Sequence, residues 1–231
     1  MNKKIKILIL SILGLIIIGG IIFGITTALP DLDVVGKESI DSFRVVTEEL
    51  KNNITADNEN NGWSLLAPDE TVRFIWSKDF SKSSFHDVML ELPAEPFIAA
   101  GLDIDKLPEG IAFDDMIMVG TKLGNEKITY EGEATPFESY KKIAELKRTS
   151  IKYHEALDHY GIDLGNGNIF EWAKDMTTND KDIVFVLDPE PFIKAGVVPE
   201  QVEGWVYAKV PTMEDGKKIE VYKFLKPFNV K

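Results

Sequence analysis

The longest apolar stretch of the chain runs from Ile7 to about Leu29, directly behind a short head that carries three lysines. At about 1.5 Å per residue, such a run can cross a hydrocarbon core of about 30 Å. Signal-peptide cores are shorter, about 7–15 residues, although the TTA triplet at 26–28 would be an imperfect cleavage site. The sequence therefore predicts an uncleaved signal anchor over residues 1–30, with cleavage as the alternative. The basic head is expected in the cytoplasm and the rest of the chain outside.

Beyond a short connector (31–36), the hydrophobic period becomes that of an amphipathic helix from Lys37 to about Ile54. Its apolar positions recur at three- and four-residue steps, namely Ile40, Phe43, Val46 and Leu50. Residues 63–67 and 71–76 then alternate in the manner of strands on either side of a Pro-Asp-Glu turn. This part of the chain predicts one helix followed by two strands.

One stretch of fifteen residues occurs twice, as Asp87–Gly101 and as Asp182–Gly196. Aligned without a gap, 8 of 15 positions are identical: Asp87/Asp182, Leu92/Leu187, Glu95/Glu190, Pro96/Pro191, Phe97/Phe192, Ile98/Ile193, Ala100/Ala195 and Gly101/Gly196. Each copy predicts a strand and then a short helix that ends at a glycine, because glycine is free to take the left-handed terminal conformation. In the second copy, Asp188 is expected to cap that helix.

The remaining pattern extends this similarity over both halves of the chain. Residues 111–122 and 127–132 predict a hairpin around Gly124-Asn125, and residues 137–160 predict a long helix. Strands are expected around the Gly-Asn-Gly turn at 165–167, and a final hairpin over 205–210 and 218–225 around Asp215-Gly216.

We therefore expect an α+β ectodomain made of two tandem repeats, with one module over residues 37–135 and a second over 136–231. Each module runs helix, two strands, loop, strand, short helix and two strands. The order is loosely similar to cystatin-like folds, in which a helix packs on a curled antiparallel sheet. That resemblance concerns the fold alone and implies no function.

The net charge of the chain limits the classes of partner that it can bind. The formal net charge is −12, and the three head lysines contribute +3 to it, so the remainder carries −15. So acidic a body argues against nucleic acid and against anionic lipid headgroups as ligands. It favours a protein or cell-envelope partner that is neutral or cationic, with the membrane contacted only through the N-terminal helix. The absence of cysteine excludes disulfides and thiolate metal sites.

Two motifs suggest metal binding, but neither has the required spacing. His154 and His159 are five residues apart, which on the predicted helix places them about 140° apart, so they could not chelate one metal. His154 is instead expected to pair with Asp158 on the helix surface. The acidic run at 57–62 resembles the start of a calcium loop, yet a proline occupies position twelve, where a glutamate is needed. We expect no metal site and no cofactor.

The sequence also lacks the familiar catalytic motifs. No nucleophile elbow or phosphate-binding glycine loop follows the anchor, and three histidines leave little for a catalytic triad. We expect no catalytic residues, and the chain is not predicted to be an enzyme. The paired aromatic residues of the two halves are interpreted as core: Phe74/Phe170, Trp76/Trp172 and Phe97/Phe192.

Two polar dipeptides follow corresponding strands and are the candidate ligand-binding residues: Lys78-Asp79 and Lys174-Asp175. Each could be a simple turn in which the aspartate bonds local N–H groups. As a repeated pair, they could also rim a binding cleft between the modules. The sequence thus predicts a membrane-anchored, extracytoplasmic binding protein. The alternatives are a structural subunit of a cell-envelope complex and, third, an extracytoplasmic hydrolase.

Overall fold

The computed structural model describes residues 32–81, 86–109, 111–113, 115–155, 157–176, 181–214 and 217–230. The predicted signal anchor over residues 1–30 and the turn at Asp215-Gly216 lie outside these ranges. Among the described helices, none has the length and apolar character that a membrane crossing requires.

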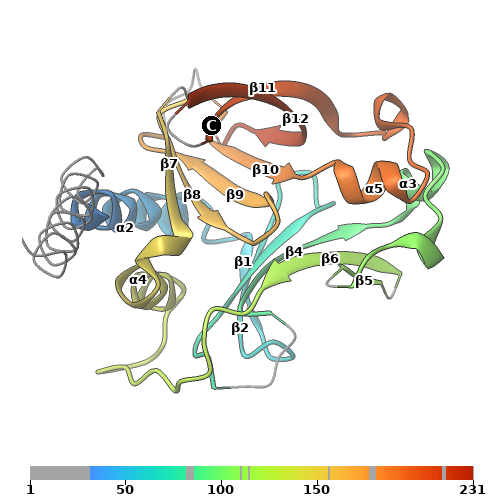
Figure 1. Cartoon of the computed structure of the whole chain (residues 1–231). Coiled ribbons are helices and arrows are strands. Elements are labelled where there is room, and N and C mark those ends of the chain that lie inside the picture. The colour runs from blue at the N-terminus through green and yellow to red at the C-terminus, as the bar shows by residue number, and fades with distance from the viewer. Residues whose placement is uncertain are drawn as a thin grey trace, which may run out of the picture.

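The chain is α+β and contains two antiparallel sheets that lie one above the other (Figure 1). Sheet A has the strand order β1-β2-β3-β4-β6-β5. Its strands are β1 (Ile54–Asp57), β2 (Gly62–Leu66), β3 (Arg73–Ser77), β4 (Val88–Pro93), β5 (Ile111–Phe113) and β6 (Met116–Thr121).

Sheet B, read from its opposite edge, has the order β7-β8-β9-β10-β12-β11. Its strands are β7 (Ile151–His154), β8 (His159–Asp163), β9 (Ile169–Ala173), β10 (Ile183–Leu187), β11 (Val206–Glu214) and β12 (Lys217–Phe228). Each sheet thus has the same order of strands along the chain, with the last two exchanged in space. The main difference in size lies in β11 and β12, which are far longer than β5 and β6.

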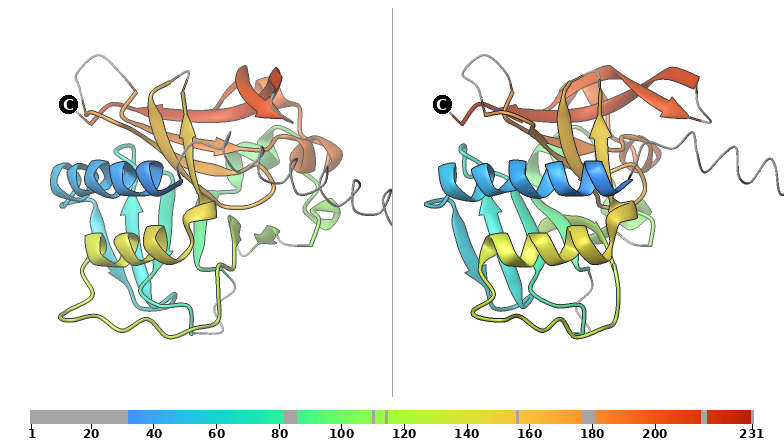
Figure 2. Two further views of the ribbon diagram at one scale, coloured as in Figure 1. Left: turned by 60° about the vertical axis from the view of Figure 1, so that its left-hand side comes forward. Right: turned by 90° about the vertical axis from the view of Figure 1, so that its left-hand side faces the viewer.

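Two helices lie side by side at one end of the sheets, as both views of Figure 2 show: α2 (Leu32–Glu49) and α4 (Pro136–Leu146). Helix α2 precedes sheet A in the chain but contacts β7 and β9 of sheet B, whereas α4 contacts β3 of sheet A. The Ser42 hydroxyl of α2 donates to the Ala173 carbonyl, and Trp63 Nε1 of β2 donates to the Ser139 hydroxyl of α4. The helices therefore tie the two halves of the chain together.

One continuous hydrophobic core fills the space between the sheets and helices. The alternating pattern correctly predicted its aromatic residues, since Trp76, Trp172 and the paired phenylalanines are essentially inaccessible. Phe74 of sheet A stacks on Phe170 of sheet B with ring centroids 4.1 Å apart. Because aromatic pairs at such distances add to the energy of burial, these rings help to hold the two sheets together.

The two short helices, α3 (Glu95–Ala99) and α5 (Glu190–Lys194), meet at the opposite end of the molecule from α2 and α4 (Figure 1). The glycines that follow them, Gly101 and Gly196, have φ of 104° and 103°. A Cβ on either would come within 2.8 Å of the other's carbonyl oxygen, so this close contact requires glycine on both sides.

Reciprocal backbone bonds hold the same contact, since the Asp103 N–H donates to the Ala195 carbonyl and the Val198 N–H donates to the Ala100 carbonyl, both at 2.8 Å. Each short helix is followed by one turn of 3₁₀ helix, η1 (Ile104–Lys106) and η3 (Pro199–Gln201). The predicted cap of α5 is wrong. Pro189 occupies the N-cap position, no side chain caps the helix, and Asp188 lies 3.5 Å from Lys223 instead.

Three element predictions were wrong. The predicted helix over 137–160 ends at Leu146, and one 3₁₀ turn, η2 (Arg148–Ser150), leads into the β7–β8 hairpin, which turns at Asp158 with φ of 53°. The stretch 127–132 is not a strand, because β6 pairs with β5 across a turn at Asp115. Helix α2 begins at Leu32, within the predicted connector over 31–36, and it ends at Glu49, before Ile54 begins β1. In each case hydrogen bonding within a sheet overrides a local helical or strand pattern.

Candidate functional site

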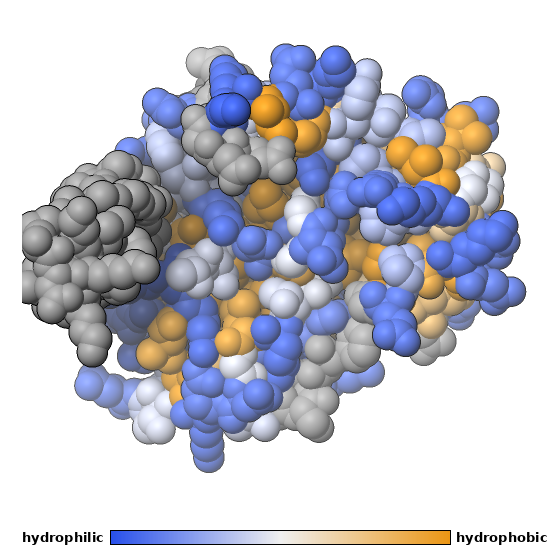
Figure 3. All heavy atoms as spheres, in the orientation of Figure 1, coloured by the Kyte–Doolittle hydropathy of each residue, from blue (hydrophilic) through white to orange (hydrophobic). Residues whose placement is uncertain are grey.

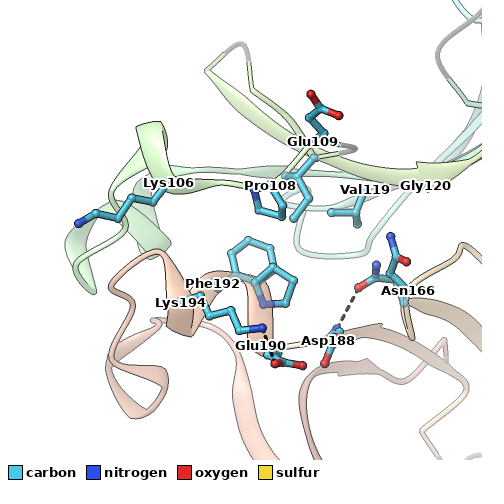
Figure 4. Close-up of a pocket in the computed structure, with 13 residues that line it drawn as sticks. Lys106, Pro108, Glu109, Val119, Gly120, Asn166, Asp188, Glu190, Phe192 and Lys194 are labelled. Carbon is cyan, nitrogen blue, oxygen red and sulfur yellow. Dashed lines mark hydrogen bonds and ion pairs between the residues drawn. The ribbon is translucent and has the colours of Figure 1, made fainter.

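A pocket of about 370 Å³ lies between the sheets, beside α5 and η1. Figure 4 shows Val119 of sheet A facing Asn166 and Asp188, which come from sheet B. Phe192 and Val119 contribute apolar surface, and both side chains are nearly inaccessible. The volume falls within the range of small-ligand sites, and the location between two sheets is one that such sites favour.

Charged groups surround this pocket in pairs. Lys106 lies 2.8 Å from Asp103, and Lys194 lies 2.6 Å from Glu190. The hydrogen bond that Lys106 donates to Asp103 raises the pKa of Lys106, and the hydrogen bond that Lys194 donates to Glu190 lowers the pKa of Glu190. Both lysines are exposed and already have carboxylate partners, so their positive charges are largely balanced at the rim.

The chemistry of the lining favours binding over catalysis. Besides the charged residues, the described part of the lining consists of asparagine, glycine, proline and aliphatic or aromatic side chains, without Ser, Thr or His. Nucleophilic catalysis most often uses a hydroxyl or thiol, which the described lining lacks, and the amines of Lys106 and Lys194 are held in ion pairs at its rim. The lining supplies amide and carboxylate acceptors above an apolar floor.

The corresponding place on the other side of the molecule is filled by a side chain of the protein itself. Val119 pairs with Leu90 in the third position of β4, and Lys226 pairs with Phe185 in the third position of β10. Val119 and Lys226 therefore occupy the same register in the two sheets. We call the surroundings of the Lys226 ammonium the Lys226 site.

The Lys226 ammonium is well satisfied although the side chain is buried. It lies 2.9 Å from Asp69, in the β2–β3 turn of sheet A, and donates to the Gly204 carbonyl at 3.3 Å. The rings of Trp205 and Phe228 both lie 5.8 Å from the nitrogen, within reach of a cation–π interaction. The stem and ammonium of Lys226 thus occupy the space whose counterpart beside Val119 is open.

The sequence-predicted residues Lys78 and Asp79 lie at the other end of the sheets, beside α4. The Lys78 ammonium is 4.4 Å from the centre of the Trp63 ring, and the backbone N–H of Lys78 donates to the Asn61 carbonyl at 2.8 Å. Asp79 accepts hydrogen bonds from the N–H and hydroxyl of Ser81. This is the local turn that the sequence offered as the simpler interpretation.

Lys174 and Asp175 occupy the corresponding loop of sheet B, beside α2. The Lys174 ammonium lies 3.1 Å from Glu38, and the backbone N–H of Lys174 donates to the Asp158 carbonyl at 3.0 Å. The bonds from Tyr160 and Lys174 lower the pKa of Glu38. None of the four predicted residues lines the pocket between the sheets.

A cluster of two histidines and one glutamate is the clearest departure from the sequence-based interpretation. Because residues 151–163 form a hairpin and not a helix, His154 and His159 are cross-strand partners. Their Nδ1 atoms lie 3.4 and 3.7 Å from the two carboxylate oxygens of Glu171, which is almost fully buried. The expected pairing of His154 with Asp158 is wrong, since Asp158 accepts from the Tyr153 hydroxyl instead.

The second contact of His154 connects distant strands of sheet B, because its Nε2 lies 3.1 Å from the Pro211 carbonyl of β11. The hydrogen bond with Glu171 raises the pKa of His154, and the bonds from the histidines lower the pKa of Glu171 against the opposing effect of burial. Among the described residues, no group of three or more His, Asp or Glu is arranged to hold a metal ion. We therefore interpret the cluster as a proton-dependent clamp within sheet B.

Sequence reasoning missed the pocket because its lining is brought together by the packing of the two sheets. Val119 and Asn166 lie in different halves, and the sequence marked Asn166 only as part of a turn. A signal was nevertheless present in the alignment of the halves. If the alignment of the two halves is extended through the last hairpin, a valine in the first half aligns with a lysine in the second half, at a strand position that is otherwise apolar.

Comparisons of the chain with protein-family models, with curated proteins and with solved structures found no match.

Proposed function

We propose that this chain is a membrane-anchored, extracytoplasmic binding protein, and that the pocket between the sheets is its ligand site. The observation that carries the proposal is the difference between Val119 and Lys226, which leaves one of two corresponding sites open. A side chain that fills a site stabilises the fold, whereas a half-polar pocket without such a side chain is typical of a surface that accepts a ligand.

The anchored location rests on the basic head and the long apolar run of residues 1–30. Protease added to intact cells, stripped of any outer layer, should digest the chain beyond residue 31 while the anchor stays with the membrane. Recovery of a soluble chain that starts near Leu29 would show instead that the segment is a cleaved signal peptide.

We further propose that the ectodomain arose by duplication, with modules over residues 37–135 and 136–231. Equal strand order in the two sheets and the reciprocal contact of Gly101 with Gly196 support this. Duplication gives a physical meaning to the comparison of sites, because both copies began with the same side chain at the positions of Val119 and Lys226.

The partner is expected to be neutral or cationic, because the chain beyond the head carries −15. Nucleic acid is not expected as a ligand. A structural subunit of an envelope complex is the second candidate, and exposed hydrophobic side chains favour it. Figure 3 shows hydrophobic residues gathering at the α3–α5 end, where Ile98, Ile193 and Val198 are each more than 40% exposed.

Site-specific photocrosslinking in intact cells tests both candidates. A photoreactive residue at Glu109, on the pocket rim, should give partner adducts that disappear when Val119→Lys fills the pocket. The matched position is Glu203, which lies one residue before Gly204 on the rim of the Lys226 site, and it should give none. Adducts at position 98 that persist in the Val119→Lys variant would favour the structural subunit and contradict the pocket as the contact site.

A further inference from the structure

We propose that the pocket binds a primary alkylammonium group, such as the end of a lysine side chain. This inference rests on the proposed function and names the ligand class of that same site. Its source is the protein's own Lys226, which shows what the corresponding space in the other sheet accepts.

The Lys226 site has three parts, namely Lys226, Asp69 and Gly204, and the counterparts of the first two line the pocket. Lys226 itself corresponds to Val119. Asp69 is the third residue after β2, and Asn166 is the third residue after β8. In the last hairpin of each sheet, Val119 pairs with Ile111 and Leu225 pairs with Val206, so in this register Glu109 corresponds to Glu203, the residue before Gly204. Val119, Asn166 and Glu109 are all lining residues of the pocket.

The corresponding acceptors suit an ammonium group. The amide oxygen of Asn166 would take the place of the Asp69 carboxylate, and Glu109 adds a carboxylate to the lining. Asp188 lines the same pocket (Figure 4), and its carboxylate lies 3.5 Å from the Lys223 ammonium, so this place already accepts the ammonium of a lysine. Since an ammonium group has three donors and no acceptor, a convergent set of oxygen atoms satisfies it.

The apolar part of the pocket suits the alkyl stem. Val119 and Phe192 are buried below the opening, and Val119 is shorter than the lysine at the corresponding position. A long aliphatic chain can lie along such a surface while its charged end remains among polar groups. The neighbouring lysines do not oppose this, because Lys106 and Lys194 are 2.8 and 2.6 Å from their own carboxylate partners.

A titration of the full chain in lipid nanodiscs tests this chemistry with defined probes. The methyl resonances of Val119 and Ile111 report occupancy by NMR. Nα-acetyl-lysine amide stands for a lysine of a partner protein, and 1,5-diaminopentane stands for a free amine. Nα-acetyl-norleucine amide has the same stem without the charge, so it should bind about tenfold or more weakly, because charge-assisted hydrogen bonds are lost.

Four variants make the test specific to this site. Val119→Lys should abolish the shifts, whereas Ile98→Lys adds the same charge at an exposed position and should leave them unchanged. Asn166→Asp copies Asp69 and should tighten binding by several-fold; the backbone there has φ of 54°, which aspartate tolerates. Lys226→Val should open a second site and add shifts around Phe224 and Leu225.

The outcomes separate the ligand class from the proposed function. Saturable shifts with either amine, lost in Val119→Lys, support the inference, and the tighter of the two amines identifies the source. Equal binding of the norleucine probe would overturn it while leaving the pocket as a ligand site. Absence of shifts with both amines, with crosslinking at position 109 retained, would overturn it without touching the proposed function. Absence of the NMR shifts and of crosslinking at position 109 would overturn both the ligand class and the proposed function.

Discussion

Sheets A and B have the same strand order and similar apolar interiors, yet they differ at a few polar positions. Phe74 and Phe170, and likewise Trp76 and Trp172, occupy the same places and are all buried. The differences fall elsewhere. Val119 corresponds to Lys226 at the α3–α5 end, and Ile75, in the third position of β3, corresponds to Glu171 in β9.

This comparison separates what builds the fold from what distinguishes the two halves. The shared positions are apolar residues and turn residues that any copy of the module needs. Sheet B has a charged residue at both places, since Lys226 fills its own site and Glu171 lies beside two histidines. Sheet A has an apolar residue at both positions, Val119 and Ile75. The open pocket thus lies between the sheets beside Val119, and the cluster around Glu171 lies in sheet B.

The largest expected effect on stability concerns two phenylalanines that occupy corresponding positions in the two halves. Phe97 and Phe192 lie with ring centroids 4.9 Å apart, and both are buried. Truncation of either ring to alanine should cost about 3–5 kcal/mol, as the loss of a buried aromatic does. Urea unfolding of Phe97→Ala and Phe192→Ala should give similar losses. A loss below about 1 kcal/mol for Phe192→Ala would mean that this ring does not belong to the shared core.

The next prediction sharpens the comparison at corresponding aspartates. Asp87 has no exposed side-chain surface, and it accepts from Lys122 at 2.7 Å and from the Leu123 N–H at 2.7 Å. Asp182 accepts from the Val230 N–H at 2.6 Å, while its Oδ1 has no hydrogen-bond partner. Asp87→Asn should therefore destabilise the protein by about 2–3 kcal/mol, the value of charged hydrogen bonds.

Asp182→Asn is the matched variant and should cost less, because its carboxylate makes fewer charge-assisted bonds. Denaturant unfolding at pH 7 measures both. Equal losses, or a larger loss for Asp182→Asn, would contradict the assignment of the stronger internal charge pair to Asp87.

A third prediction concerns pH and the cluster found only in sheet B. The pKa of His154 lies above its usual value of 6.5, so the stability it contributes is present below that pH and is lost as pH rises through the raised pKa. The pKa of Glu171 lies below its usual value of 4.5, so its contribution is present above pH 4.5 and is lost as pH falls through the lowered pKa.

The stabilising effect of the cluster should therefore be greatest between about pH 4.5 and 6.5 and should weaken toward pH 9. Unfolding free energies of the wild type and Glu171→Gln should differ most in that window. Glu91→Gln, an outer-face carboxylate of sheet A paired with Arg73, is the control and should show no such maximum. A pH-independent difference between wild type and Glu171→Gln would refute the proton-dependent clamp.

The smallest expected effect concerns the four residues predicted from the sequence. Lys78→Glu and Lys174→Glu should each change stability by about 1 kcal/mol or less, since exposed pairs contribute little. If the loops after Trp76 and Trp172 rim a ligand site, the double variant should weaken partner capture while the protein stays folded. If the pocket alone binds the partner, crosslinking at position 109 should be unaffected by the double variant.

Much of the fold was predictable from local pattern. The repeated segment, strands β2 to β4 and the last hairpin follow from alternation and turn residues, and the core aromatics follow from their strand positions. The β7–β8 hairpin was not predicted, because Ile151, His154 and Leu157 continue an apparently helical period, whereas β7 forms through its pairing with β8. The His154–Glu171–His159 cluster was missed for the same reason.

The candidate site was less predictable than the fold. The lining of the pocket comes from both sheets, and its opening depends on the shortness of one side chain. Lys78 and Lys174 stood out because they are polar and repeated, yet repetition marks what the halves share. The difference at Val119 and Lys226 is established by the hydrogen-bond register that aligns β6 with β12.

The exchange of those two side chains tests the central claim most directly. In the double variant Val119→Lys/Lys226→Val, the filled site and the open pocket should change places between the sheets. Photocrosslinking in intact cells would then compare position 109 with position 203 in the wild type and in the exchanged protein. We predict that the partner adduct moves from position 109 to position 203, whereas an adduct that remains at position 109 in the folded double variant would contradict the account.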